Sequence, residues 1–183
     1  ADGIGVVYGS RILGTPLKER VPGIELAQNL MGKMAETGKT LFLLGSKPGV
    51  AEEAARRLCD TYKGLQIVGT HDGYFKKEGE ENEAVLSRIR ESGARIVFIC
   101  FGAPAQEKWI AANRDKLPGV NLLLGLGGSL DVYSGRVKRA PAIFVRLGLE
   151  WLYRLLKEPK RIGRMMNLPK FYFGTWKYKL FHK

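Results

Sequence analysis

Cysteine is scarce in this sequence: among 183 residues only Cys59 and Cys100 occur. Two cysteines cannot build a disulfide framework, and each lies in an apolar run, so we expect reduced thiols that fill space in a core. A catalytic thiol would need a histidine partner. His71 and His182 are adjacent to neither cysteine in the sequence, and their contact in space stays open.

Long apolar runs are also lacking. No stretch reaches 18 apolar residues, so no segment is suited to span a bilayer, and no signal peptide is visible. The His, Cys and carboxylate residues match no metal-ligand spacing, and we therefore predict no metal. The chain opens with Ala1 rather than Met, and we expect it to be a truncated form whose upstream segment is missing.

Positive charge is plentiful and unevenly placed. Hydrophobic residues make up 45% of the chain, enough for one substantial core. The net charge is +12, and residues 146–183 hold ten Lys or Arg against Glu150 and Glu158, a net +8. We therefore predict an α/β domain over residues 1–145 and a basic appendage over residues 146–183.

Continuous apolar segments that stop at glycine predict buried strands. The segments are residues 40–44 before Gly45, 95–100 before Gly102, 121–124 before Gly125 and, shorter, 65–68 before Gly69. Because their hydrophobicity is continuous rather than alternating, both faces should be covered, as in a parallel sheet.

Helical patterns separate these strands. Apolar residues recur at helical spacing in residues 27–34, 51–58 and 80–92, and a weaker pattern begins at Ile4. Strands that alternate with helices predict a Rossmann-like, doubly wound, mostly parallel sheet with helices on both faces, followed by a helical appendage. Ligands of such sheets bind beyond the carboxyl ends of the strands, so the loops there are the candidate sites.

Two of these loops lead into helices. Residues 45–49 contain two glycines, and the N–H groups at a helix start suit an anion such as a phosphate. This loop matches neither the dinucleotide nor the P-loop pattern, and a plain turn explains it equally well. Residues 102–109 place Gln106 and its charged neighbours on a first helical turn over the sheet edge; the alternative is charges that face solvent.

The third loop, residues 125–131, carries closely spaced glycines that let a substrate approach the backbone. Its Ser129 and Asp131 can hydrogen-bond a ribose or sugar hydroxyl. Three cations follow within residues 136–139 and suit a diphosphate without a metal; a solvated run of charge is the alternative.

Two further positions offer a carboxylate and a ring. Asp2 stands between Ala1 and Gly3, where a lone Asp is usually only a helix cap. Tyr74 follows the short predicted strand, where its ring can stack on a base or merely cover the sheet edge.

Several motifs follow one another along the chain in a recognisable order. They are Ala1-Asp2-Gly3, Glu19-Arg20-Val21 with Gly23, Leu43-Leu44-Gly45, residues 69–75, 102–109, 127–131 and 135–141, and residues 148–154 through Glu158-Pro159. Together these motifs closely resemble the WecG/TagA/CpsF family of bacterial glycosyltransferases, glycosyltransferase family 26, of the N-acetylmannosaminyltransferase type. Members of that family carry several dozen residues before the Asp-Gly motif, including sheet strands and a Thr at the sugar site, which this sequence lacks.

The resemblance implies an inverting, metal-independent enzyme that needs no cofactor. It would move a hexosamine, N-acetylmannosamine first among the candidates, from a UDP-sugar to N-acetylglucosamine linked through diphosphate to undecaprenol, in teichoic acid-type cell-wall synthesis. Residues 1–145 would then be the nucleotide-sugar-binding catalytic domain. The resemblance further implies a cytoplasmic protein, peripheral on the inner face of the bacterial membrane, with no nucleic-acid partner; a homo-oligomer stays open.

The resemblance also implies roles for individual residues. Asp2 resembles the general base that takes the proton of the acceptor hydroxyl. Contacts to the UDP-sugar are implied for Arg20, Tyr74 near the uracil, Gln106, Gly127, Gly128, Ser129, Asp131 and Lys138. Three arginines of the appendage resemble those that neutralise the leaving diphosphate: Arg154, Arg161 and Arg164.

The end of the chain is rich in aromatic residues as well as cations. Residues 151–183 hold eight of the eighteen aromatic residues. Aromatic rings favour the headgroup layer, and a cation near an anionic leaflet contributes about 1 kcal/mol, so we predict docking on an anionic membrane surface. The alternatives are a nucleotide- or nucleic-acid-binding module, whose cations bind phosphates and whose rings stack on bases, and a helix for a partner subunit.

Overall fold

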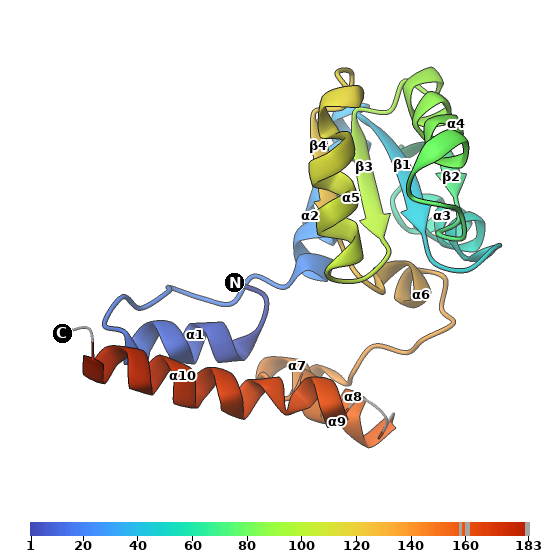
Figure 1. The fold of residues 1–183 in the computed structure, drawn as a ribbon. Helices are drawn as coiled ribbons and strands as arrows, with labels where there is room; N and C mark the ends of the chain where they lie inside the picture. The colour runs from blue at the N-terminus through green and yellow to red at the C-terminus, as the bar shows by residue number, and fades with distance from the viewer. Residues whose placement is uncertain (158, 160–161, 182–183) are drawn as a thin grey trace. The chain divides into compact units, whose positions relative to one another are not determined.

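The structure is a computed structural model that describes residues 1–157, 159 and 162–181 (Figure 1). The chain forms two compact units, one made of Ala1–Pro22 with Arg139–Lys183 and the other of Gly23–Lys138. The sequence places a boundary after residue 145. The structure groups the N-terminal segment with the C-terminal one, because helix α1 (Ile4–Ile12) packs against helix α10 (Asn167–Phe181). The division into a catalytic domain over residues 1–145 and a membrane-docking appendage stays a prediction.

The second unit is built on a parallel sheet. Its strands are β1 (Thr40–Gly45), β2 (Gln66–His71), β3 (Ile96–Cys100) and β4 (Leu122–Gly125). Within the described residues they form one four-stranded sheet in the order β2-β1-β3-β4, and every neighbouring pair is parallel. The four apolar segments therefore form the predicted doubly wound arrangement.

Helices cover both faces of this sheet. One face packs against α2 (Gly23–Thr37), α3 (Val50–Thr61) and α6 (Ser129–Tyr133). The other face packs against α4 (Gly79–Glu91) and α5 (Ala105–Asn113), which a 3-10 turn at Arg114–Lys116 follows. The helices expected near residues 27–34, 51–58 and 80–92 are confirmed.

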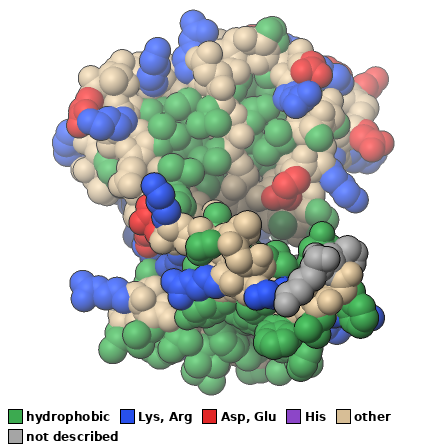
Figure 2. All heavy atoms as spheres, turned by 90° about the vertical axis from the view of Figure 1, so that its left-hand side faces the viewer, with side chains coloured by type: hydrophobic (Ala, Val, Ile, Leu, Met, Phe, Trp, Pro, Cys, Tyr) green, Lys and Arg blue, Asp and Glu red, His purple; other side chains and the backbone are tan. Residues whose placement is uncertain are grey.

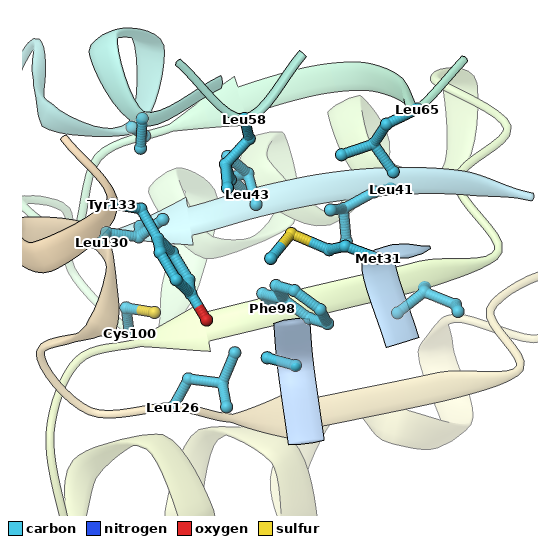
Figure 3. Packing of buried hydrophobic residues seen from close by; sticks show 14 of the residues in the cluster. Met31, Leu41, Leu43, Leu58, Leu65, Phe98, Cys100, Leu126, Leu130 and Tyr133 are labelled. Carbon is cyan, nitrogen blue, oxygen red and sulfur yellow. The ribbon is translucent and has the colours of Figure 1, made fainter. Parts of the chain in front are cut away.

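Alternate residues of each strand supply the two cores. Leu43 and Phe98 point to the face of α2 and α3, where Met31 and Leu58 meet them (Figure 3). Phe42 and Val97 point to the opposite face. Full burial of such a side chain contributes about 1.5–3 kcal/mol, so the central strands β1 and β3 hold the unit together.

Strand β2 is longer than its sequence predicts. The apolar pattern places its end before Gly69, and that expectation is wrong because the strand continues to His71. The Phe42 ring lies over Gly69, so that a Cβ atom there would come within 2.5 Å of the ring, and the β1–β2 register shifts between Leu41 and Phe42. Glycine at this position accommodates a neighbouring ring and does not end the strand.

A buried polar network fastens α5 to α4. Trp109 Nε1 donates to Asn82 Oδ1 at 2.7 Å, and Asn82 Nδ2 donates to Asn113 Oδ1 at 2.9 Å. Asn113 Nδ2 in turn donates to the carbonyl oxygen of Trp109 at 2.9 Å. Buried amides are costly without partners, so this closed set of bonds fixes how the two helices pack.

The first unit is helical in its described residues. After α1 it contains α7 (Ala142–Arg146), α8 (Glu150–Lys157), α9 (Ile162–Met165) and α10. Gly5 and Gly9 let α1 approach α10, since a Cβ atom on either would come within 3 Å of Leu168 or Phe171. No described helix is both long and apolar enough to cross a membrane.

The end of β1 gives a test of this packing. Gly45 has a φ of 135°, and a Cβ atom there would lie 2.5 Å from the carbonyl oxygen of Cys100. We expect Gly45→Ala to lower the free energy of unfolding by roughly 2–5 kcal/mol through strain and overpacking, as measured by urea denaturation.

Gly32 in α2 is the matched control, because it is helical and nothing lies within 4 Å of its Cβ position. Gly32→Ala should raise the free energy of unfolding by about 0.5–1 kcal/mol. Equal effects of the two substitutions would contradict the close approach of β1 and β3.

Candidate functional site

The order of the strands singles out one edge of the sheet. From β1 the chain passes to β2 on one side and then to β3 on the other, so the direction of winding reverses between β1 and β3. Doubly wound sheets bind ligands at the carboxyl ends of the strands beside such a reversal. We call the group of residues there the carboxyl-edge site: Ser46, Tyr74, Gln106, Gly127, Gly128, Ser129 and Asp131.

Ser46 connects three of the loops at this edge. Its N–H donates to the carbonyl oxygen of Cys100 at 3.2 Å, and its own carbonyl oxygen accepts from the N–H of Gly73 at 2.8 Å. Its Oγ donates to Asp131 Oδ1 at 2.9 Å. The loop after β1 is therefore bonded to the end of β3, to the loop after β2 and to α6.

Gln106 shapes the loop after β4. The side chain is 5% exposed, and its Oε1 accepts from the N–H of Gly127 at 2.9 Å. Its Nε2 donates to Glu107 Oε1 at 2.9 Å, and its amide lies over Gly125, where a Cβ atom would come within 2.6 Å. Gln106 thus fixes the glycine loop through one bond to its backbone and through contact with Gly125.

The start of α6 brings Asp131 to the same edge. Ser129 Oγ donates to the carbonyl oxygen of Leu126 at 2.7 Å, so this buried hydroxyl serves the turn. The backbone of Asp131 accepts from the N–H of Val137 at 2.9 Å. A carboxylate has about four acceptor positions, so Asp131 keeps capacity for a ligand besides its bond from Ser46.

The loop after β2 presents an aromatic ring. Tyr74 is 68% exposed, and its N–H donates to Asp72 Oδ1 at 2.7 Å. Lys77 Nζ secures this loop by donating to the carbonyl oxygens of Gly73 and Phe75 at 2.7 and 2.9 Å. The same Nζ lies 3.4 Å from the centre of the Phe75 ring, and burial lowers the pKa of Lys77.

Exposed cations lie beside the loop after β1. Arg136 NH2 is 3.7 Å from the Cβ position of Gly49, which precedes α3, and Lys138 follows on the same segment. A helix start and a guanidinium group both favour negative charge. The run of cations expected from the sequence therefore begins next to a helix N-terminus.

The remaining predicted site residues belong to the first unit. Asp2 is exposed before α1, and the carbonyl oxygen of Ala1 accepts from the N–H of Val21 at 2.8 Å. Arg20 NH2 donates to the carbonyl oxygen of Val145 at 3.4 Å. Of the three predicted appendage arginines, Arg154 lies in α8 and Arg164 in α9, and only their backbone is described. Arg161 lies outside the described residues.

Sequence reasoning missed two residues that organise this edge. Ser46 lies in a loop that the sequence explains equally well as a plain turn, and a serine between Gly45 and a helix start is only a weak signal. Lys77 gave no signal, because its partners are backbone carbonyls and two rings, Phe75 and Phe101. Both roles depend on which loops the sheet brings together.

The thiol beside the site is a packing group. Cys100 is 4% exposed at the end of β3, and burial raises the pKa of its thiol to about 12. Such a thiol stays protonated at neutral pH and is a poor nucleophile. The packing role expected of this cysteine is confirmed, and a catalytic thiol is not supported.

Comparison with known proteins identifies the chain. Residues 1–183 match the pattern of the family described as glycosyl transferase WecG/TagA/CpsF family. The chain belongs to this family. It is also 40% identical over 178 residues to a protein of Bacillus spizizenii strain W23 named N-acetylglucosaminyldiphosphoundecaprenol N-acetyl-beta-D-mannosaminyltransferase. That match covers 97% of this chain and 67% of the relative.

The WecG/TagA/CpsF resemblance seen in the sequence is thereby confirmed, and so is its Rossmann-like sheet. The roles expected for single residues of this glycosyltransferase remain predictions. The structure gives the carboxyl-edge residues, from Ser46 to Asp131, one common location in the second unit, and it gives Asp2 and Arg20 a place in the first.

Differential alkylation tests the state of the two thiols. In the folded protein at pH 8, iodoacetamide should leave Cys100 unmodified because burial keeps it protonated, whereas both cysteines should react in guanidinium chloride. Mass spectrometry of tryptic peptides gives the extent of reaction. Rapid labelling of Cys100 in the folded protein would contradict its assignment as an inert core residue.

Proposed function

We propose that this chain is an inverting glycosyltransferase that moves N-acetylmannosamine from UDP to N-acetylglucosamine linked through diphosphate to undecaprenol. Family membership and 40% identity to the Bacillus spizizenii protein of that activity carry the proposal. The reaction is a step in teichoic acid-type synthesis of the cell wall.

The donor would bind at the carboxyl-edge site. The exposed ring of Tyr74 offers a stacking surface for uracil, and Asp131 offers a carboxylate for hydroxyl groups. Arg136 and Lys138 supply positive charge for the diphosphate, so the proposal needs no metal ion for charge neutralisation. Gln106 supports the glycine loop over which the sugar nucleotide would lie.

The transfer itself is a single displacement. The acceptor hydroxyl oxygen forms a bond to the anomeric carbon while the bond from that carbon to the UDP oxygen breaks, and UDP leaves with the electron pair. Asp2 takes the proton of the acceptor hydroxyl as general base. Three arginines of the appendage neutralise the developing charge on the diphosphate, and they are Arg154, Arg161 and Arg164. Arg20 contacts the donor.

The acceptor is a lipid, and the first unit offers a surface for the membrane that holds it. A groove of about 520 Å³ lies between α1 and α10, lined by Ile12, Tyr172, Phe173, Trp176, Lys177, Leu180 and Phe181. Its exposed apolar members, which we call the apolar face, are Phe173, Trp176, Leu180 and Phe181. In the lower part of Figure 2 apolar side chains gather over this unit, with Lys and Arg beside them.

The chemistry of this face favours a lipid over a nucleic acid. Phe173 and Phe181 are 78% and 74% exposed, and they stand beside Leu180, which cannot stack on a base. Aromatic rings settle at the headgroup layer, and Lys170 and Lys177 on the same helix favour anionic lipids. These residues support a peripheral position on an anionic membrane surface, for which we propose the inner face of the cytoplasmic membrane.

A substitution of the proposed base tests the reaction. With UDP-N-acetylmannosamine and a lipid-diphospho-N-acetylglucosamine analogue, Asp2→Asn should lower the rate of UDP release by about 10²–10⁴-fold. Its dissociation constant for UDP should stay the same, because the carboxylate acts on the acceptor.

The matched control for this test is Glu91→Gln, which removes an exposed carboxylate at the end of α4, outside every motif and predicted site residue. It should release UDP at the rate of the unaltered protein. Full turnover by Asp2→Asn would remove Asp2 from the mechanism.

Vesicle sedimentation tests the apolar face. Phe173→Ser combined with Trp176→Ser should reduce binding to phosphatidylglycerol-containing vesicles by at least about tenfold, because two exposed rings no longer reach the headgroup layer. Leu26→Ser with Val68→Ser, two exposed apolar residues of the second unit, is the control and should bind as before. Tight binding to RNA or DNA at matched salt without vesicle binding would instead support the nucleic-acid alternative.

A further inference from the structure

Ser46 has an unusual backbone conformation that the proposed function does not by itself explain. It is the one non-glycine residue with positive φ, at 62°, among the described residues. Its neighbours Gly45 and Gly49 have positive φ as well, and glycine takes that conformation with little strain. Because positive φ strains a serine, the contacts of its hydroxyl are of interest.

The hydroxyl contacts a carboxylate from a distant part of the chain. Ser46 Oγ donates to Asp131 Oδ1 at 2.9 Å across a separation of 85 residues. The other carboxylate oxygen, Oδ2, is 3.8 Å from the Cβ position of Gly128, on the side of the glycine loop. The bond from Ser46 thus holds one oxygen and leaves the second directed toward the backbone that a ligand would approach.

The groups around Ser46 follow the order in which the base, ribose and phosphates of a uridine nucleotide would need partners. On one side its carbonyl oxygen is bonded to Gly73, which precedes the exposed ring of Tyr74. On the other side its loop reaches Gly49, against which Arg136 lies. A base at Tyr74 and phosphates at Arg136 leave the ribose in between, next to Asp131.

We propose that Ser46 is a positioning residue that sets the Asp131 carboxylate to accept hydrogen bonds from the ribose hydroxyls of the donor. The two neighbouring hydroxyls of a ribose match the two oxygens of a carboxylate, which accepts several hydrogen bonds. This inference rests on the proposed function for the presence of the nucleotide, and it names the part of the nucleotide that the Ser46–Asp131 pair distinguishes.

Calorimetric titration with UDP, 2′-deoxy-UDP and 3′-deoxy-UDP tests the proposal. The unaltered protein should bind UDP about tenfold more tightly than either deoxy form, as expected for a hydrogen bond to a charged group. Ser46→Ala should weaken UDP binding about tenfold and the binding of either deoxy form by less, because a deoxy form keeps only one of the two hydroxyls that the carboxylate accepts. In an Asp131→Asn background, Ser46→Ala should cause no further loss.

A second variant separates this role from a structural one. Ser46→Gly removes the same hydroxyl but also relieves the positive φ, so its melting temperature should exceed that of Ser46→Ala while its loss of UDP affinity is the same. Ser92→Ala, which removes a hydroxyl bonded to the carbonyl oxygen of Ile89, is the control and should keep the preference for UDP.

Each outcome decides between the two proposals. Equal losses for UDP and the deoxy forms, or affinities that follow the melting temperatures, would overturn the role of Ser46 and leave the glycosyltransferase proposal standing. A protein that turns over UDP-sugar but binds UDP and the deoxy forms equally well would likewise overturn the role of Ser46 and leave the glycosyltransferase proposal standing. Failure of the unaltered protein to bind UDP at all would overturn both.

Discussion

The close approach of β1 and β3 at their carboxyl ends is the constraint on which the carboxyl-edge site depends. A Cβ atom on Gly45 would lie 2.5 Å from the carbonyl oxygen of Cys100, so the strand must end in glycine. The chain leaves this contact with positive φ at both Gly45 and Ser46 before α3 begins. That path turns the polar groups of Ser46 toward neighbouring loops, and the bonds to Gly73 and Asp131 follow from it.

The two cores of the second unit support different loops of the site. The core on the α2 and α3 side includes Leu130 and so fixes α6, which carries Asp131. The opposite core supports the loop that carries Tyr74 through a series of edge contacts in which Phe75 meets Phe101 at 5.8 Å and Phe101 meets Trp109 at 5.7 Å between ring centres. Lys77 lies against the first two rings, at 3.4 and 4.4 Å from their centres. Ser46 joins the two halves, because it bonds to both loops.

The sequence was sufficient for the strands and helices and insufficient for the contacts between loops. Continuous apolar segments locate β1, β3 and β4, since burial on both faces requires such runs. Asp131 could be placed on a loop at the sheet edge by the same logic, yet its bond to Ser46 could not, because strand order brings together residues 85 positions apart. The extension of β2 through Gly69 cannot be predicted from the sequence for a similar reason, because the Phe42 ring of the neighbouring strand explains that glycine.

Helix α10 of the first unit carries apolar residues on two sides. Leu168 and Phe171 pack toward Gly5 and Gly9 of α1. Phe173, Trp176 and Leu180 recur at helical spacing on another side and are more than half exposed. A helix that is apolar around much of its circumference requires cover on each side, and α1 supplies it on one. A membrane surface would cover the other while Lys177 kept its charge among the headgroups, so the glycines of α1 and the proposed lipid contact both follow from the apolar residues on two sides of one helix.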